Sequence, residues 1–361
     1  MNKIKILEIV PNMQQGGLEN LIMNIIRNLD MQKYEIHFLY HYTGNYYFDE
    51  EIQKIGCTIH KCSFREDKNI FKYIKFLKSF FKENHFDVVH SHMLSTSRLT
   101  LKYAKQNDCK ILINHSHNRK TEKSLKGIIK RFMILNASKY ANEFLSCSEE
   151  AGKFAYGNRK FTVVKNGIDL KKFSYSAENR KQIRKELNIG EKDIIFGNVG
   201  RLNVQKNQSF LIECFAKIKN NNAKLMIIGY GELKEEIVSK INEININEKV
   251  IMLENVKSEY YYSAMDCFVL PSIFEGFPLT AVEAQANGCP CAFSDKITKD
   301  VKLNNNVKFL DIDNADEWIQ FFNNFNMKRE KRYSEKLLDY DTDKLINVIE
   351  KIYSKGAHDE N

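Results

Sequence analysis

The chain has 361 residues, of which 43% are hydrophobic and 28% charged, a composition that excludes a disordered protein and favours about two folded domains. Lys and Arg total 55 and Asp and Glu total 46, so the formal net charge is +9. Residues 1–172 carry 29 basic and 17 acidic residues, a net of +12, whereas the remainder carries 26 and 29, a net of −3. This split indicates that one half meets an anionic partner, with nucleic acid, an anionic membrane surface and a phosphorylated substrate all open.

The sequence lacks the signals of a membrane-spanning or secreted protein. No run approaches the roughly 18 consecutive apolar residues of a membrane span. The N-terminal MNKIKILEIV leads straight into a strand-like segment without a signal-peptide layout, so we expect a cytoplasmic protein. The eight cysteines form no Cys-x-x-Cys pair, and Cys289 and Cys291 have no second pair to complete a zinc site, so buried free thiols are expected.

Short apolar runs alternate with segments of helical period. In the first half the expected strands are Ile4–Val10, Glu35–His41, Thr58–Lys61, Asp87–His90, Lys110–Asn114, Glu143–Ser146 and Thr162–Lys165. The expected helices between them include Leu18–Leu29, Ile70–Glu83 and Ser97–Gln106. The second half restarts the pattern with strands at Ile194–Val199, Leu225–Ile228, Val250–Leu253, Cys267–Leu270 and Pro290–Phe293, and a last helix is expected at Thr342–Ser354.

Strands that are apolar throughout and separated by helices predict parallel sheets covered on both faces. Two successive runs therefore predict an α/β protein of two doubly wound, Rossmann-like domains. A polar linker follows Asn166-Gly167, which places the domains at residues 1–172 and 173–340, with a C-terminal helix at 341–361 that can pack back on the first domain. Ligands of such sheets bind at the carboxyl ends of strands, so the residues after each strand are the candidates for a site.

The loop and helix after the strand ending at Leu270 form the most informative segment. Glu275 lies in the loop, Pro278 suits the first turn of the following helix, and Glu283 lies one to two turns further on. The backbone N–H groups of residues 276–280 are expected to be unpaired at a positive helix end, which makes an anion site. An ordinary strand–helix unit with a capping glutamate is the alternative reading of the same residues.

Two glycine-containing loops follow neighbouring strands of the second half. In Gly200–Asn207, Arg201 and Lys206 can both reach a phosphate, Arg as a fork and Lys as a point charge. Two basic residues in a loop are also common on solvated surfaces. Gly229-Tyr230-Gly231 lacks the third glycine of a dinucleotide fingerprint and is a weak signal.

The first half has polar residues at three strand ends. Gly16 and Gly17 open a helix after the first strand, where backbone can approach a phosphate closely. His90 and His92 follow the fourth strand and His115 and His117 the fifth, and alternation places each pair on one side of its strand. Such a cluster can bind a metal, act as acid or base, or hydrogen-bond a polar ligand. We disfavour a metal because no carboxylate or thiolate of suitable spacing joins the histidines.

These residues together resemble a family-4 glycosyltransferase of the GT-B type over nearly the whole chain. The strongest element is the Glu-x7-Glu signature at Glu275 and Glu283, supported by Gly-Arg-x4-Lys-Asn at Gly200–Asn207. The Gly-Gly-Leu-Glu start, His-Ser-His-Asn and Gln-Lys-Asn-Gln-Ser are similar to the capsular and exopolysaccharide branch. The resemblance implies two Rossmann-like domains facing each other across a cleft that holds a nucleotide sugar. It also implies metal-independent transfer, without a cofactor, that retains the anomeric configuration.

The resemblance also assigns roles to residues. Arg201 and Lys206 match the positions that neutralise the donor diphosphate and stabilise the leaving group. Glu283 matches the carboxylate that binds the ribose, and Glu275 the one that contacts the donor sugar. The remaining donor-binding matches are Gly16, Gly17, Asn255, Val256, Gly276, Phe277, Pro278 and Leu279.

On the acceptor side, His92 matches the histidine near the reacting sugar, as a ligand of its 6-position or a helper at the acceptor hydroxyl. His117 joins it through its place at the neighbouring strand end rather than through the family pattern. His92, Glu275, Arg201 and Lys206 are thus the expected catalytic residues. Because no residue must be a covalent nucleophile, front-face substitution by the acceptor is the expected mechanism.

The leading hypothesis is a retaining glycosyltransferase that moves a sugar from a nucleoside-diphosphate sugar, a UDP-sugar, onto a lipid-linked oligosaccharide bound by the N-terminal domain. Arg119–Arg131 has six basic residues and one acidic residue, and either touches the anionic inner face of the cell membrane or is a solvated helix face. A sugar-nucleotide epimerase and a non-catalytic sugar-binding subunit are the alternatives. The basic half has no interleaved aromatics on a recognisable module, so nucleic acid is disfavoured.

Overall fold

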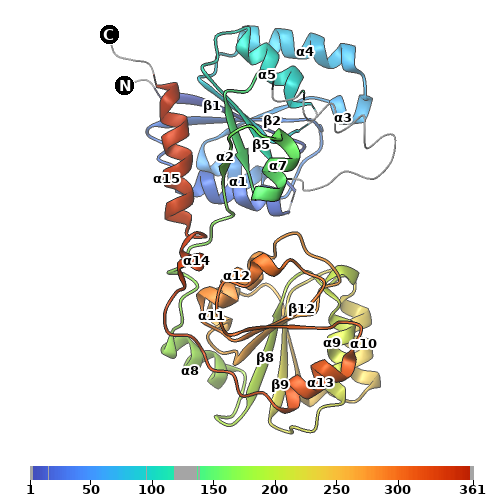
Figure 1. Cartoon of the computed structure of the whole chain (residues 1–361). Helices are drawn as coiled ribbons and strands as arrows, with labels where there is room; N and C mark the ends of the chain where they lie inside the picture. Colours follow the sequence, from blue (N-terminus) through green and yellow to red (C-terminus); the bar gives the residue numbers. More distant parts are fainter. Residues whose placement is uncertain (1–2, 15, 95, 118–135, 137–138, 358–361) are drawn as a thin grey trace. The chain divides into compact units, whose positions relative to one another are not determined.

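The computed structural model describes residues 3–14, 16–94, 96–117, 136 and 139–357. The chain divides into two compact units, which Figure 1 shows in sequence colours. The first contains Met1–Gly167 and Thr342–Asn361, and the second contains Ile168–Asp341. The C-terminal helix therefore groups with the first unit.

The first unit is built on a parallel sheet of seven strands in the order β3-β2-β1-β4-β5-β6-β7. Its strands are β1 (Ile4–Val10), β2 (Tyr34–Tyr40), β3 (Thr58–Lys61), β4 (Val88–Ser91), β5 (Ile111–Ser116), β6 (Glu143–Ser146) and β7 (Thr162–Val163). Its helices are α1 (Gly17–Asn28), α2 (Asp49–Ile55), α3 (Phe64–Asp67), α4 (Ile70–Glu83), α5 (Ser97–Lys105), α7 (Glu149–Tyr156) and α15 (Thr342–Tyr353), which the short η4 (Ser354–Gly356) follows.

The second unit has a parallel sheet of six strands in the order β10-β9-β8-β11-β12-β13. Its strands are β8 (Ile194–Val199), β9 (Ala223–Ile228), β10 (Val250–Leu253), β11 (Cys267–Leu270), β12 (Cys291–Ser294) and β13 (Val307–Leu310). Its helices are α8 (Ala177–Glu186), α9 (Gln208–Ala216), α10 (Lys234–Glu243), α11 (Ser258–Tyr261), α12 (Leu279–Ala286), α13 (Ala315–Asn323) and α14 (Glu335–Leu338), with short 3₁₀ turns η1 (Val204–Lys206), η2 (Asn247–Lys249) and η3 (Lys299–Val301).

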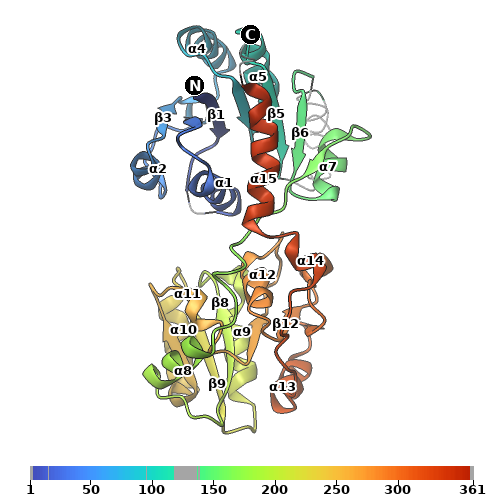
Figure 2. The same ribbon diagram turned by 90° about the vertical axis from the view of Figure 1, so that its left-hand side faces the viewer.

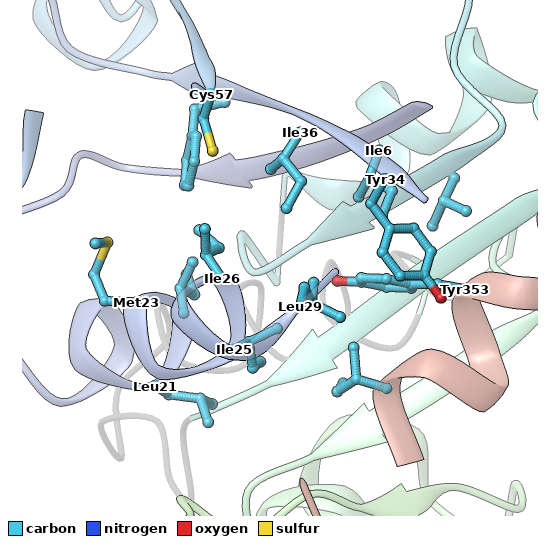
Figure 3. Close-up of a cluster of buried hydrophobic side chains, with 14 of the residues drawn as sticks. Ile6, Leu21, Met23, Ile25, Ile26, Leu29, Tyr34, Ile36, Cys57 and Tyr353 are labelled. Carbon is cyan, nitrogen blue, oxygen red and sulfur yellow. The ribbon is translucent and has the colours of Figure 1, made fainter. Parts of the chain in front are cut away.

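Helices cover both faces of the first sheet because its strands bury side chains on both sides. On one face, α1 and α15 lie side by side over the strands, as Figure 2 shows. The apolar residues of α15 recur at helical spacing, at Leu345, Ile346, Ile349 and Ile352, and all join this core. Tyr353 ends the helix next to Tyr34, with ring centroids 6.1 Å apart, and Figure 3 shows both rings in the cluster.

The structure confirms the expected fold class and corrects two details of the sequence reading. A thirteenth strand, β13, was not predicted, because Lys308 is exposed and three asparagines precede this sheet-edge strand, so the segment has the composition of a loop. The strands of the first unit are also not apolar throughout. Polar side chains are buried along them, with Glu8 in β1 and His90, Ser91, Asn114, His115 and Ser116 at the ends of β4 and β5.

Candidate functional site

The topological switch point of the second sheet lies between β8 and β11. The chain winds outward from β8 in one direction to β9 and β10, and in the other direction to β11, β12 and β13. In open parallel sheets the ligand binds where the strand order reverses, beyond the carboxyl ends of the strands. The loops that follow β8 and β11 carry the predicted donor residues, so these residues occupy the position that the topology favours.

Lys206 and Glu275 bring the two switch-point loops together. The Lys206 Nζ lies 2.7 Å from Glu275 Oε1, and the two side chains are only 15% and 10% exposed. Ser272 Oγ donates to the same carboxylate oxygen at 3.0 Å, and Gln205 Nε2 donates to Glu275 Oε2 at 3.2 Å. A carboxylate accepts roughly four hydrogen bonds and an ammonium donates three, so both groups retain capacity for a ligand.

Arg201 lies in the same loop as Lys206 but has a different partner. Its Nε lies 3.1 Å from Glu232 Oε2, and the Arg201 side chain is 64% exposed. An exposed ion pair of this kind contributes little to stability, so the guanidinium can exchange its partner for a phosphate at small cost. The structure therefore places the two predicted phosphate-binding cations in different settings. Lys206 is held in a mostly buried ion pair, whereas Arg201 is exposed and can change its conformation.

The start of α12 presents unpaired backbone donors. None of the N–H groups of Gly276, Phe277, Leu279 and Thr280 has an acceptor among the described residues, and the buried Thr280 Oγ1 also lacks a partner. The helix begins one residue later than expected, because Pro278 has an extended ψ of 113° and occupies the cap rather than the first turn. The unpaired donors and the helix dipole have the arrangement that an anion site requires, and anion binding there stays a prediction.

Glu283 lies on α12 with one carboxylate oxygen fixed and the other open. Tyr262 Oη donates to Glu283 Oε2 at 2.7 Å, while Oε1 has no partner among the described residues. Burial raises the pKa of Glu283 above its ordinary value, and the hydrogen bond from Tyr262 opposes that shift. A partly exposed carboxylate with one free oxygen is suited to accept hydrogen bonds from hydroxyl groups.

The Gly-x-Gly after β9 supports the loop that carries Arg201. A side chain at Gly229 would place its Cβ 1.9 Å from the Gly200 carbonyl oxygen, and one at Gly231 would lie 2.2 Å from that of Leu202. The Gly200 N–H donates to the carbonyl of Ile228 at 3.0 Å. These glycines allow two backbones to approach each other, which explains the motif without a dinucleotide.

The remaining predicted donor residues lie at strand ends of both sheets. Asn255 and Val256 follow β10, where Asn255 has a left-handed backbone with φ of 53° and Val256 packs on the core. Gly16 caps α1 after β1 of the first sheet, and Gly17 is the first residue of that helix. A side chain at Gly17 would meet no atom within 4 Å, so there is open space beside this residue.

The switch point of the first sheet, between β1 and β4, carries the histidine cluster. Side chains alternate along a strand, so five residues project to one face. They are Glu8 in β1, His90 in β4 with His92 just after it, and His115 in β5 with His117 just after it. The expected pairing is confirmed: ring centroids lie 4.2 Å apart for His90 and His92, and 4.1 Å apart for His115 and His117.

Glu8 contradicts the argument that no carboxylate joins the histidines. Its Oε2 lies 2.9 Å from His92 Nε2, and its Oε1 lies 3.3 Å from His90 Nδ1. Tyr353 of α15 donates to Glu8 Oε1 at 2.6 Å. The sequence did not indicate a role for Glu8 or Tyr353. Glu8 has the pattern of one polar residue in an otherwise apolar strand. The only available signal was that single charged residue within ILEIV.

His92 is fully enclosed, whereas His117 is partly buried. The His92 side chain is not exposed, and its Nδ1 lies 2.9 Å from His117 Nε2. Burial, with the neighbouring charge of His90, lowers the pKa of His92 to about 4. Burial and the charges of His92 and His90 likewise hold the pKa of His117 well below its ordinary value. Both histidines are therefore neutral at pH 7.

The histidine cluster has the composition of a metal site, but most of its ring nitrogens are already hydrogen-bonded to neighbouring residues. Ligand atoms of His90, His92 and His115 lie within 4.8 Å of one another. His90 Nε2 lies 3.1 Å from His115 Nδ1, and only the buried Nε2 of His115 lacks a partner in this trio. Protons shared between the rings already account for the close approach of these nitrogens.

The predicted membrane segment Arg119–Arg131 lies outside the described residues. Within the part of the chain that the structure describes, no helix is long and apolar enough to cross a bilayer.

Comparisons with known proteins show the family and the fold of the chain. Residues 15–172 match the family model described as Glycosyltransferase Family 4, and residues 179–307 match the model described as Glycosyl transferases group 1. Among solved structures, that of Anabaena Alr3699/HepE in complex with UDP superposes with a TM-score of 0.77 at 15% identity, covering 98% of this chain and 100% of that one.

Three curated relatives extend over most of the chain. The putative glycosyltransferase EpsF of Bacillus subtilis is 28% identical over 82% of this chain and 80% of its own. The capsular polysaccharide biosynthesis glycosyltransferase CapH of Staphylococcus aureus is 28% identical over 84% and 85%. The UDP-Gal:alpha-D-GlcNAc-diphosphoundecaprenol alpha-1,3-galactosyltransferase of Escherichia coli is 24% identical over 81% and 80%. The chain therefore belongs to the GT-B glycosyltransferases, with a family-4 domain followed by a group-1 domain, and it is similar to the capsular and exopolysaccharide branch of these enzymes.

Proposed function

We propose that the protein is a retaining, metal-independent glycosyltransferase that transfers a sugar from a UDP-sugar to a lipid-linked intermediate of a cell-surface polysaccharide. The observation that carries the donor assignment is the start of α12, where unpaired N–H groups adjoin the Lys206–Glu275 pair at the switch point. That geometry suits a diphosphate, since backbone donors, a helix dipole and a cation converge on one position. The UDP complex of the similar fold and the undecaprenol-linked substrate in one relative's name support the choice of substrates.

Each residue of the donor site takes the role that the family resemblance implies, and its surroundings are compatible with that role. Lys206 keeps two N–H donors beyond the Glu275 bond and takes the β-phosphate, while Arg201 leaves Glu232 to join it. Glu283 accepts the ribose hydroxyls on its open oxygen. Glu275 receives a hydroxyl of the donor sugar on its remaining lone pair. Lys206 and Arg201 stabilise the negative charge that develops on the departing diphosphate, so the proposal requires neither a metal nor a cofactor.

Retention is the outcome that the family resemblance implies, and the absence of an assigned nucleophile bears only on how it is reached. The Glu275 carboxylate is held by Lys206, Ser272 and Gln205, so it is placed to bind rather than to attack. We therefore assign front-face substitution, in which the acceptor oxygen bonds to the anomeric carbon as the bond to the diphosphate breaks. The electron pair of that bond leaves with the diphosphate, and the hydroxyl proton of the acceptor passes to an oxygen of that diphosphate.

Donor turnover tests the assignment directly. A thermal-shift screen against nucleoside diphosphates and their sugars identifies the donor, and turnover with and without EDTA checks metal independence. Glu275→Ala is expected to lower transfer strongly, and transfer as fast as in the parent would disprove the site. An altered UDP-sugar formed without any acceptor would indicate an epimerase, and donor binding without turnover a non-catalytic subunit.

Membrane contact through Arg119–Arg131 is part of the same proposal. Its six basic residues and one acidic residue give the segment the charge that binds anionic lipid surfaces, where the acceptor lipid resides. Co-sedimentation with anionic vesicles at low salt checks this contact. No binding under those conditions would remove the membrane contact from the proposal, and binding to neutral vesicles alone would remove its electrostatic basis.

A further inference from the structure

A buried carboxylate lies at the centre of the histidine cluster, and the proposed reaction gives it no role. Glu8 is 2% exposed, and its two oxygens face Tyr353, His90 and His92. Burying an isolated carboxylate is costly, so the surrounding donors must compensate for lost water. Burial acts to raise the pKa of Glu8, but the electrostatic effect of His90 and the hydrogen bonds of His90 and His92 outweigh it and hold that pKa well below its ordinary value.

The hydrogen-bond chain from Glu8 has one consistent proton order. An ionised carboxylate only accepts, so His92 must carry its proton on Nε2, which faces Glu8 Oε2. A neutral imidazole has one N–H, so His92 Nδ1 is an acceptor, and the N–H that it receives belongs to His117 Nε2. His117 Nδ1 is then left as a lone pair. It has no partner among the described residues.

We propose that Glu8 is a positioning residue that sets the proton order of His92 and so presents the Nδ1 lone pair of His117 to a hydroxyl of the sugar acceptor. This inference rests on the proposed function. It places His92 in the middle of the hydrogen-bond chain from Glu8 to His117, because both ring nitrogens of His92 are hydrogen-bonded. The group that contacts the acceptor is His117, at the partly exposed carboxyl end of β5.

Tyr353 connects this chain of hydrogen bonds to the C-terminal helix α15. Its hydroxyl donates to Glu8 Oε1, because an ionised carboxylate offers no proton in return. The same hydroxyl lies 2.7 Å from His90 Nδ1, from which it accepts. Packing of α15 on the sheet therefore fixes the orientation of Glu8, and through Glu8 the orientation of His92 and His117.

Replacing Glu8 by glutamine makes a sharp prediction about protons. The amide oxygen is needed by the Tyr353 hydroxyl, so the amide nitrogen faces His92 and donates to its Nε2. His92 must then carry its proton on Nδ1, and His117 in turn on its own Nδ1. The variant Glu8→Gln is thus expected to reverse the His117 tautomer and to convert its exposed nitrogen from acceptor to donor.

The chain offers a matched control on the same sheet. Glu35 Oε1 lies 2.8 Å from His37 Nε2, and His37 Nδ1 lies 3.1 Å from His60 Nε2. This second carboxylate–histidine–histidine chain lies on β2 and β3, away from the switch point. Glu35→Gln removes a carboxylate that likewise contacts a histidine pair, although Glu35 is 39% exposed, and it is expected to leave the His117 tautomer and sugar transfer unchanged.

The test is long-range ¹H–¹⁵N NMR of the full chain with labelled histidine and no ligand, with the His117 signals assigned by their loss in His117→Gln. The parent and Glu35→Gln should show the proton on Nε2, and Glu8→Gln should show it on Nδ1. A proton on Nδ1 of His117 in the parent would overturn the proposed proton order even if Glu8→Gln failed to fold.

Kinetics supply the second readout. With UDP-sugars as donor and GlcNAc-diphosphoundecaprenol as acceptor, Glu8→Gln should lower kcat by roughly 100-fold or more, with the Kd for UDP and acceptor-free donor hydrolysis unchanged. An equal loss of donor hydrolysis would overturn the acceptor role, as would an unchanged kcat. If no donor supports transfer in the parent, the proposed function fails, while the NMR reading still decides the proton order.

Discussion

Replacing Glu283 by glutamine should weaken UDP binding through the ribose alone. The amide keeps an oxygen for the Tyr262 hydroxyl, which now donates to Glu283 Oε2 at 2.7 Å, so the fold should survive. What changes is the second oxygen, which becomes an NH₂ group that cannot accept from a ribose hydroxyl. A hydrogen bond to a charged group contributes about 1.5–3 kcal/mol, so the Kd for UDP should rise by about 10- to 150-fold.

Calorimetry with two nucleotides isolates this contribution. The parent should bind UDP more tightly than 2′,3′-dideoxy-UDP, and Glu283→Gln should lose that preference while its affinity for the dideoxy compound stays near that of the parent. Glu259→Gln is a suitable control, because Glu259 pairs with Lys172 at 3.3 Å close to Glu283. Equal weakening for both nucleotides would refute ribose recognition by Glu283.

Three further results are expected. Lys206→Ala should lower donor turnover roughly 100- to 1,000-fold in steady-state assays, and a loss below 10-fold would contradict its place at the diphosphate. Because burial lowers the pKa of His92 to about 4 and that of His41 to about 3, the unfolded chain binds more protons below pH 6.5. The free energy of unfolding in urea should therefore fall between pH 6.5 and 4 by about 1.4 kcal/mol per pH unit and histidine, and a flat profile would refute neutral burial. Gly229→Ala, whose Cβ would meet a carbonyl at 1.9 Å, should displace the neighbouring loop and raise the Kd for UDP, which an unchanged Kd would contradict.

The fold, and the places of the predicted donor residues in the second unit, could be predicted because their signals are local. Strands such as Ile4–Val10 and Ile194–Val199 are short apolar runs between helical segments, and the structure has them with those bounds. Glu275, Lys206 and Glu283 follow strand ends that the parallel topology brings to one edge. The pairing of Lys206 with Glu275 needs only two neighbouring loops, so motif spacing and strand order suffice to predict its location.

The centre of the first site could not be predicted because its contacts are remote in sequence. Tyr353 meets Glu8 across 345 positions, and its only local signal is that of an apolar helix position. Glu8 lies on a strand whose alternation predicts its face but not its partners. The direction of the protons depends on which ring nitrogens face each other, and only three-dimensional coordinates provide that geometry.

The stereochemistry of the transferred sugar tests the central claim most directly. A purified sample is incubated with α-linked UDP-sugars and GlcNAc-diphosphoundecaprenol in the presence of EDTA, and the anomeric proton of the product is followed by NMR. The account predicts an α-linked product with release of UDP. A β-linked product, a requirement for added metal, or conversion of the donor without an acceptor would contradict it.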